Sequence, residues 1–174
     1  RRIQPTRPTR NGLLPAMLYG LGTLAFTLAA YFLWFHDDLR EAGVADVVRT
    51  KLSAYRVGSP LAFFGMTVYY VSAHTLVEEY YWRWFFFGRL RELISPAAAI
   101  WVSAIVFMAH HVFLANRYVG DMWSLIALFS LGVAVSGGVW AWLYQKTNAL
   151  YAPWLSHCVV EFGLLGMGYD LWRG

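Results

Sequence analysis

Five long apolar runs dominate the chain, and each is about as long as a helix that crosses a bilayer. Such a helix needs about 20 mostly apolar residues. The runs are apolar all round rather than along one stripe, which favours burial in lipid over amphipathic soluble helices. A proline lies at or near the start of four of them, where a missing N–H costs little. The predicted spans are 12–35, 61–88, 97–116, 122–144 and 149–171.

The polar stretch 36–60 separates the first two runs. Its apolar residues recur at helical spacing, namely Leu39, Val44, Val47, Val48, Leu52 and Tyr55. We expect an amphipathic, partly helical connector that lies on the membrane surface or caps the bundle. The predicted fold is therefore all-α, a polytopic membrane helical bundle of about five transmembrane helices plus this connector. Its parts are a basic N-terminus with the first anchor (1–35), the connector (36–60) and the remaining bundle (61–174).

Composition narrows the class of protein. Of 174 residues, 59% are hydrophobic and only 14% are charged, against about 25% charged in ordinary soluble domains. This excludes a soluble nucleic-acid binder and a disordered tail. With Cys158 as its single cysteine, the chain forms no intrachain disulfide and is not a disulfide scaffold. The net charge of +4 is better interpreted as membrane topology than as nucleic-acid binding.

The distribution of basic residues predicts an orientation, because arginine and lysine in short loops favour the cytoplasmic side. A cytoplasmic N-terminus places seven of them there: Arg1, Arg2, Arg7, Arg10, Arg89, Arg91 and Lys146. The other side then receives Arg40, Arg49, Lys51, Arg56 and Arg117. The first apolar run is too long for a cleaved signal peptide, so we expect an uncleaved anchor.

Histidine and glutamate side chains inside the spans converge at one depth. Ionisable groups in a bilayer are costly and are candidates for function by default. We measure depth at 1.5 Å per residue from the side that holds Gly88, Ala97 and Asn148. Glu78 and His157 then lie roughly 15 Å deep, and the remaining four lie roughly 20 Å deep: His74, His110, His111 and Glu161. Three separate spans thus bring them near the middle of a ~30 Å hydrocarbon core, which predicts a single site.

Helical spacing assigns the carboxylates to different roles. Glu79 and Arg83 are i,i+4 neighbours, so we expect a buried ion pair along their own helix. Glu78 projects about 100° away and is left as the carboxylate available for chemistry. His157 and Glu161 are also i,i+4 neighbours and face the same way.

The other polar side chains have plainer interpretations. Adjacent residues of a helix point about 100° apart, so we expect only one of His110 and His111 to face the cluster. We interpret His74 as structural and Cys158 as a small packing residue.

Three kinds of chemistry suit such a cluster, and the residues alone leave them open. A carboxylate and an imidazole can activate water for hydrolysis. Histidine and glutamate together can bind a divalent metal ion. A proton relay or ion pathway is the third. The chain contains no evident Ser-His-Asp arrangement, P-loop or HExxH motif.

Three ordered motifs resemble those of the CPBP family, which comprises the CAAX proteases and bacteriocin-processing enzymes. Residues 78–83 (EEYYWR) match its EExxxR motif, and residues 107–111 (FMAHH) match FxxxH, which selects His111 over His110. Residues 152–157 (APWLSH) resemble the approach to the third motif, HxxxN or HxxxD. The resemblance covers residues 60–171.

The resemblance implies an intramembrane endopeptidase. Glu78 would be the water-activating base with His111 as its partner, and His157 and Glu161 would stabilise the oxyanion or orient the water. Arg83 would hold Glu79. Family members have been described as metalloproteases and as metal-free glutamate proteases, so zinc bound by Glu78, His111 and His157 stays open. The resemblance implies a membrane-anchored protein or peptide substrate. We expect no nucleic-acid partner and a bacterial inner membrane as the location.

The third motif departs from the family, because Glu161 stands where Asn or Asp is usual. An ionised glutamate offers no hydrogen-bond donor to an oxyanion. This departure motivates an alternative function, a non-catalytic protease-like subunit or assembly factor of a larger membrane complex. A transporter or proton-relay fragment is less favoured, because the chain has no broken-helix repeat.

Overall fold

Helices form all the regular secondary structure in the part of the chain that the structure describes. The computed structural model describes residues 10–119 and 122–174. The predicted all-α fold is confirmed. Three of the arginines behind the predicted orientation, Arg1, Arg2 and Arg7, lie outside the described residues.

Each predicted span corresponds to a long helix whose ends differ from the prediction by a few residues. The first comprises α1 (Arg10–Ala30) and the π-helical η1 (Tyr31–Phe35). The second is one continuous helix made of α4 (Pro60–Tyr69), η2 (Tyr70–His74), α5 (Thr75–Glu79), η3 (Tyr80–Phe87) and α6 (Gly88–Leu93). The last three are α7 (Pro96–Val119), α8 (Trp123–Thr147) and α9 (Tyr151–Arg173).

By length and composition, three of these helical stretches are apolar enough to cross a membrane. They are Gly12–Glu41, Pro96–Arg117 and Trp123–Thr147. The helix over 60–93 and α9 carry the remaining polar residues of the candidate site, beside His110 and His111 of α7, and the crossing of the membrane by these two helices stays a prediction.

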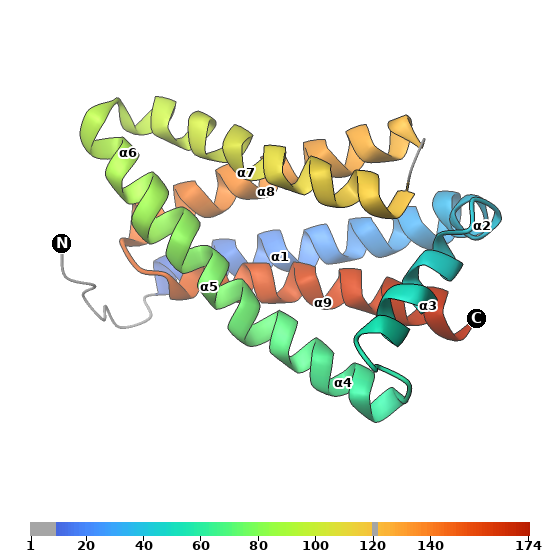
Figure 1. The fold of residues 1–174 in the computed structure, drawn as a ribbon. Coiled ribbons are helices and arrows are strands. Elements are labelled where there is room, and N and C mark those ends of the chain that lie inside the picture. Colours follow the sequence, from blue (N-terminus) through green and yellow to red (C-terminus); the bar gives the residue numbers. More distant parts are fainter. Residues whose placement is uncertain (1–9, 120–121) are drawn as a thin grey trace.

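The helices pack as two pairs crossed by the long second helix. Figure 1 shows α1 beside α9, α7 beside α8, and the α4–α6 helix running diagonally across them. Small residues bring the members of each pair close together. A Cβ on Gly137 of α8 would lie 3.0 Å from Phe107 Cδ1 of α7, and one on Gly20 of α1 would lie 3.1 Å from the Ser156 carbonyl oxygen of α9.

The connector forms two short helices, α2 (His36–Glu41) and α3 (Val44–Ala54), which cap the C-terminal end of α9. The Tyr31 hydroxyl donates to Asp170 Oδ2 at 2.8 Å, and the Arg40 guanidinium donates to the Asp170 carbonyl oxygen at 3.1 Å. Leu39 and Val44 are buried in one cluster with Leu171. Most of the apolar face predicted for this stretch therefore packs on the bundle, whereas Tyr55, which we placed on that face, is 71% exposed.

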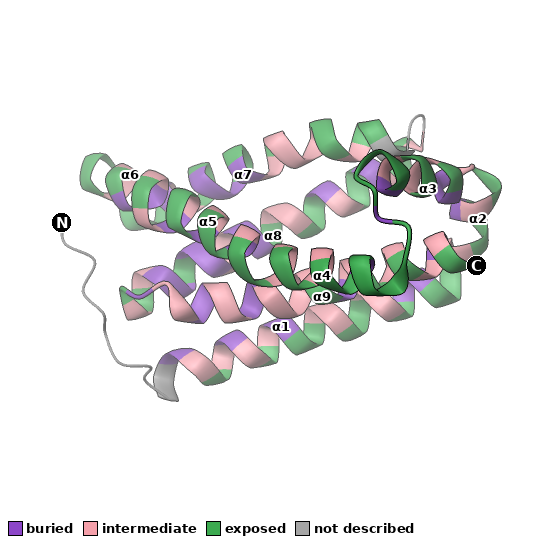
Figure 2. Cartoon of the chain, turned by 60° about the horizontal axis from the view of Figure 1, so that its bottom comes forward, coloured by how far each residue is buried: buried purple, intermediate pink, exposed green. Residues whose placement is uncertain are grey.

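Burial is concentrated where the diagonal helix meets α7, α8 and α9. Figure 2 shows that α4 is mostly exposed. By contrast, Phe107 and Trp140 belong to a buried cluster near the middle of the bundle. Two fully buried charged side chains, Glu79 and Arg83, lie in the same region. The core thus surrounds the segment that carries the candidate chemistry.

Two π-helical segments, η2 and η3, flank the single α-helical turn α5. A π-helix shifts each hydrogen bond to i→i+5, and such segments are frequent at functional sites. Side chains of α9 bond to two carbonyl groups of η2: Cys158 Sγ donates to the Val71 oxygen at 2.8 Å, and Trp154 Nε1 donates to the Ser72 oxygen at 3.0 Å. These contacts join α9 to the helix that carries Glu78 and Glu79.

Candidate active site

The predicted pair of Glu79 and Arg83 is present and fully buried. Arg83 Nε lies 3.1 Å from Glu79 Oε2, and both side chains have an exposed fraction of 0%. The guanidinium also lies over the rings of Phe107, at 4.6 Å, and Trp140, at 5.2 Å. Because these cation–π contacts occur in a desolvated setting, they add to the ion pair. Glu79 is therefore held by Arg83, as i,i+4 spacing predicts.

Glu79 also fixes His157, which the sequence did not reveal. His157 Nδ1 lies 2.9 Å from Glu79 Oε1, and because an ionised carboxylate can only accept, Nδ1 is the donor. The His157 ring stacks on Trp140 with centroids 4.0 Å apart and planes 22° apart. Trp140 Nε1 in turn donates to Ser156 Oγ at 3.2 Å. The ring is thus locked in position and its tautomer is set.

Glu78 lies at the centre of three imidazole rings. Its carboxylate oxygens are 3.7 Å from His110 Nε2, 3.8 Å from His74 Nε2 and 3.7 Å from His157 Nε2. These distances exceed a direct hydrogen bond. The Glu78 side chain is 17% exposed, so it is neither sealed in the core nor open on the surface.

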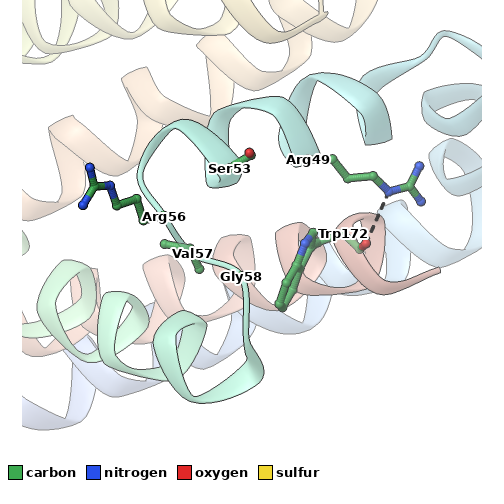
Figure 3. Close-up of a pocket in the computed structure, with 6 residues that line it drawn as sticks. All are labelled: Arg49, Ser53, Arg56, Val57, Gly58 and Trp172. Atoms are coloured by element: carbon green, nitrogen blue, oxygen red, sulfur yellow. Dashed lines mark hydrogen bonds between the residues drawn. The ribbon is translucent and has the colours of Figure 1, made fainter.

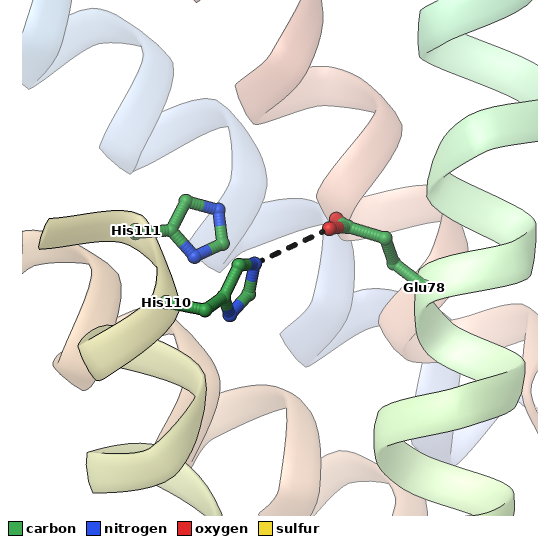
Figure 4. Close-up of side chains that lie close together, drawn as sticks. All are labelled: Glu78, His110 and His111. Atoms are coloured by element: carbon green, nitrogen blue, oxygen red, sulfur yellow. Dashed lines mark ion pairs between the residues drawn. The ribbon is translucent and has the colours of Figure 1, made fainter. Parts of the chain in front are cut away.

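The two adjacent histidines of α7 both lie beside Glu78. Their ring centroids are 4.0 Å apart, and Figure 4 shows both facing the Glu78 carboxylate. His110 makes the ion-pair contact and stacks on Trp82 with planes 10° apart. His111 instead uses Nδ1 on the Phe107 carbonyl oxygen of its own helix, at 3.0 Å.

This arrangement differs from the expectation that only one of these two histidines would face the cluster. It also adds His74, which we interpreted as structural. The sequence gives the angle of about 100° between adjacent side chains of a helix. It does not give the rotation of α7 about its own axis, which depends on packing against α8 and η3. His74 carried a signal in the sequence, since it precedes Glu78 by four residues. Trp82 and Trp140 carried none, because nothing local marks a tryptophan as the platform of a distant histidine.

Glu161 lies one turn beyond His157 on α9 and is partly buried. It interacts electrostatically with His157, Glu78 and His74. Within the described part of the chain, it forms no hydrogen bond or ion pair. It therefore belongs to the surroundings of the cluster rather than to its contacts.

One group of side chains has the composition of a metal site. One ligand atom from each of Glu78, His110 and His111 can be chosen so that all three lie within 4.8 Å of one another. Two imidazoles and a carboxylate fit the preferences of Zn²⁺, which takes three protein ligands and a water in catalytic sites. The family resemblance implied Glu78, His111 and His157 as the ligands, whereas this group contains His110 in place of His157.

Comparison with known proteins identifies the family. The family model described as type II CAAX prenyl endopeptidase Rce1-like matches residues 60–163, which include Glu78, Glu79, Arg83, the two adjacent histidines and His157. No curated protein and no solved structure matches the chain. Together with the long apolar helices, the match makes this an integral membrane protein of the protease type. The chain belongs to the Rce1-like type II CAAX prenyl endopeptidases, a part of the CPBP family.

Proposed function

We propose that this protein is an intramembrane endopeptidase that hydrolyses a peptide bond near the end of a membrane-associated protein or peptide. The observation that carries the proposal is the convergence of three imidazole Nε2 atoms, at 3.7–3.8 Å, on the Glu78 carboxylate. The neighbouring carboxylate, Glu79, is occupied by Arg83 and His157. Glu78 is thereby the one of the pair left to act on water.

In the proposed reaction, Glu78 takes a proton from a water molecule, and the oxygen attacks the carbonyl carbon of the scissile bond. His157 in its protonated form donates from Nε2 to the tetrahedral oxygen, since Nδ1 is held by Glu79. When the C–N bond breaks, the proton held by Glu78 passes to the amine nitrogen. Glu161 is proposed to orient the water or the developing oxyanion.

The metal-dependent version uses the same residues differently. A zinc ion held by Glu78 and the histidines of α7, with His157 as a further ligand, would acidify a bound water and polarise the carbonyl group. The donor set of Glu78, His110 and His111 supports it. We keep it as a second form of the same proposal.

The test is Glu78→Gln in the full chain, reconstituted in lipid nanodiscs with fluorescence-quenched prenylated peptides that end in a CAAX sequence. We expect cleavage to fall by about 10²–10⁴-fold, the usual contribution of a general base, with the melting temperature unchanged. The control is Glu41→Gln, an exposed carboxylate of α2. Retention of cleavage by the Glu78 variant would contradict the proposal. Loss of activity on chelation, with zinc found in the purified protein, would select the metal-dependent version.

The alternative function is a non-catalytic subunit or assembly factor of a larger membrane complex. Glu161 supports it, because a longer acceptor replaces the Asn or Asp that the family resemblance leads us to expect. Copurification with partner proteins at fixed stoichiometry, together with absence of cleavage by the unmodified chain, is the result expected for it. Restored cleavage in Glu161→Asn would instead identify an enzyme weakened at this residue.

We also propose a bacterial inner membrane as the location, with the N-terminus in the cytoplasm. The proposed orientation is supported by the basic residues that flank the spans, among them Arg89, Arg91 and Lys146. The same orientation leaves the connector and the C-terminal end of α9 on the opposite side.

A further inference from the structure

The α4–α6 helix is held tightly in its second half and weakly in its first. In the second half, Glu79, Arg83 and Phe87 all have an exposed fraction of 0%. In α4, Phe63 is the one buried residue. One turn further on, Thr67 Oγ1 is buried and has no hydrogen-bond partner among the described residues. Because burial of an unpaired hydroxyl costs free energy, the contact of α4 with the bundle is a weak one.

Three aromatic rings make that contact, and we call them the docking cluster. Phe63 of α4 meets Tyr169 of α9 with ring centroids 5.1 Å apart. It also stacks on Trp172 of α9, with centroids 5.5 Å apart and planes 9° apart. Trp172 lies beside the turn at Val57 and Gly58 that leads into α4 (Figure 3). The docking cluster thus ties the start of α4 to the end of α9.

The π-helical segment η2 lies between the two halves of the helix. The Thr75 N–H donates to the Tyr70 oxygen, five residues back, and to the Ser72 oxygen. In an α-helix this N–H would donate to the Val71 oxygen, four residues back. The Val71 oxygen accepts from two side chains, Thr75 Oγ1 at 2.6 Å and Cys158 Sγ of α9 at 2.8 Å. Side chains of α9 therefore help to stabilise the π form of η2.

The π form also decides which face α4 turns toward α9. Phe63 contacts α9 at the docking cluster, and Glu79 contacts His157 of the same helix. At about 100° per residue, an unbroken α-helix would place Phe63 and Glu79 about 160° apart, on opposite faces. A π turn holds more residues and so rotates the chain less per residue. Conversion of η2 to an α-helix would therefore turn Phe63 away from α9.

The elements around Glu78 differ in how firmly they are held. Glu78 follows η2 by one turn and its side chain is 17% exposed, so a peptide backbone reaches it where a neighbouring element yields. α7 packs along α8, and α9 packs along α1, whereas α4 depends on the docking cluster. We propose that α4 is a gate of the active site, hinged at η2. The π form of η2 docks α4 on α9, and the α form turns α4 away and admits substrate to Glu78. This inference rests on the function proposed above.

Thiol labelling in nanodiscs tests the motion without reference to activity. The background is Cys158→Ser, which removes the single native thiol and keeps a hydrogen-bond donor for the Val71 oxygen. Thr67→Cys places a reporter thiol under docked α4. Ser103→Cys is the matched reporter in the fixed core, since Ser103 of α7 is 1% exposed. A membrane-permeant maleimide is added, and the labelling rate of each reporter is measured.

We expect both reporters to react slowly when the gate is otherwise unmodified. Phe63→Ala should raise the rate at Thr67→Cys about tenfold or more, since loss of aromatic packing favours the open form. Trp154→Phe should raise it by a smaller factor, because the indole donates to the Ser72 oxygen of η2. Ser103→Cys should keep its slow rate in both variants. Equal rates at Thr67→Cys in all variants overturn the proposal, as does a parallel rise at Ser103→Cys.

A reducible crosslink tests the connection to cleavage, in the same Cys158→Ser background. Phe63→Cys/Tyr169→Cys, joined by a short thiol crosslinker, fixes α4 to α9. The control, Ala104→Cys/Gly138→Cys, fixes α7 to α8, where the two Cβ atoms would lie 3.8 Å apart, within disulfide range. We expect the first crosslink to abolish cleavage until it is reduced, and the control to leave cleavage intact. Cleavage by the chain with α4 fixed overturns the gate. Absence of cleavage by the unmodified chain contradicts the proposed function instead, and the labelling rates still decide whether α4 moves.

Discussion

At the scale of single residues, the site depends on charges that are buried only because they are paired. Glu79 has 0% exposure; one of its oxygens forms an ion pair with Arg83, and the other accepts a hydrogen bond from His157 Nδ1. A buried ion pair adds little net stability, whereas removal of one partner leaves an uncompensated charge. Glu79 thus links folding to the orientation of the histidine that faces Glu78.

Arg83→Met should lower the free energy of unfolding by about 3–5 kcal/mol, because it leaves the buried Glu79 carboxylate without a compensating positive charge. The double variant Glu79→Gln/Arg83→Met should recover most of that loss, since the amide oxygen of glutamine still accepts from His157 Nδ1. Denaturant unfolding in detergent measures both free energies. Equal destabilisation in the single and double variants would mean that the ion pair does not act as a unit.

His110 and His111 make a second residue-scale test. The family motif assigns the role of Glu78's partner to His111, but the ion-pair contact at 3.7 Å belongs to His110. We predict that His110→Gln lowers kcat for peptide cleavage more than His111→Gln does, with KM little changed in both. Melting temperatures of the two variants control for lost stacking on Trp82. A larger loss in His111→Gln would show that substrate binding turns α7 toward the arrangement in the motif.

At the scale of elements, apolar runs and prolines were sufficient to predict the five long helices to within a few residues. The π-helical segments were not predictable from the sequence. The same residue types can form i→i+4 or i→i+5 hydrogen bonds, and the packing of neighbouring helices decides which pattern forms. The pairing of Glu79 with Arg83 followed from spacing within one helix. The contacts of His157 with Glu79, and of His110 with Glu78, depend on how two helices are turned about their axes, which local spacing does not encode.

The contact between α7 and α8 shows how packing turns a helix toward the site. Gly137→Ala would bring a methyl group to 3.0 Å from Phe107 Cδ1, whereas Gly138→Ala meets nothing closer than 3.8 Å. Phe107 lies under Arg83 and against both histidines of α7. We therefore expect Gly137→Ala to cost about 1–3 kcal/mol of stability and to lower cleavage, and Gly138→Ala to be nearly neutral. Thermal unfolding and a cleavage assay on both variants test this pair.

At the scale of the whole molecule, the site requires the α4–α6 helix to cross the membrane together with the others. Its 34 residues, Pro60 to Leu93, extend about 51 Å at 1.5 Å per residue. This exceeds the ~30 Å hydrocarbon core, and a diagonal course accommodates a helix of that length. The ends of this helix should therefore face opposite sides of the membrane, and Glu78 should lie between them.

Single cysteines introduced into a Cys158→Ala background test this topology. Tyr55→Cys marks the end near α3, and Leu93→Cys and Lys146→Cys mark the opposite end; all three positions are exposed. With a cytoplasmic N-terminus, an impermeant maleimide added to intact bacterial spheroplasts should label Tyr55→Cys, and should reach the other two only after permeabilisation. The reverse pattern would invert the orientation and keep the five spans. Labelling of Tyr55→Cys and Leu93→Cys from the same side would contradict the prediction that the second span crosses the membrane. It would equally contradict the placement of Glu78 inside the membrane.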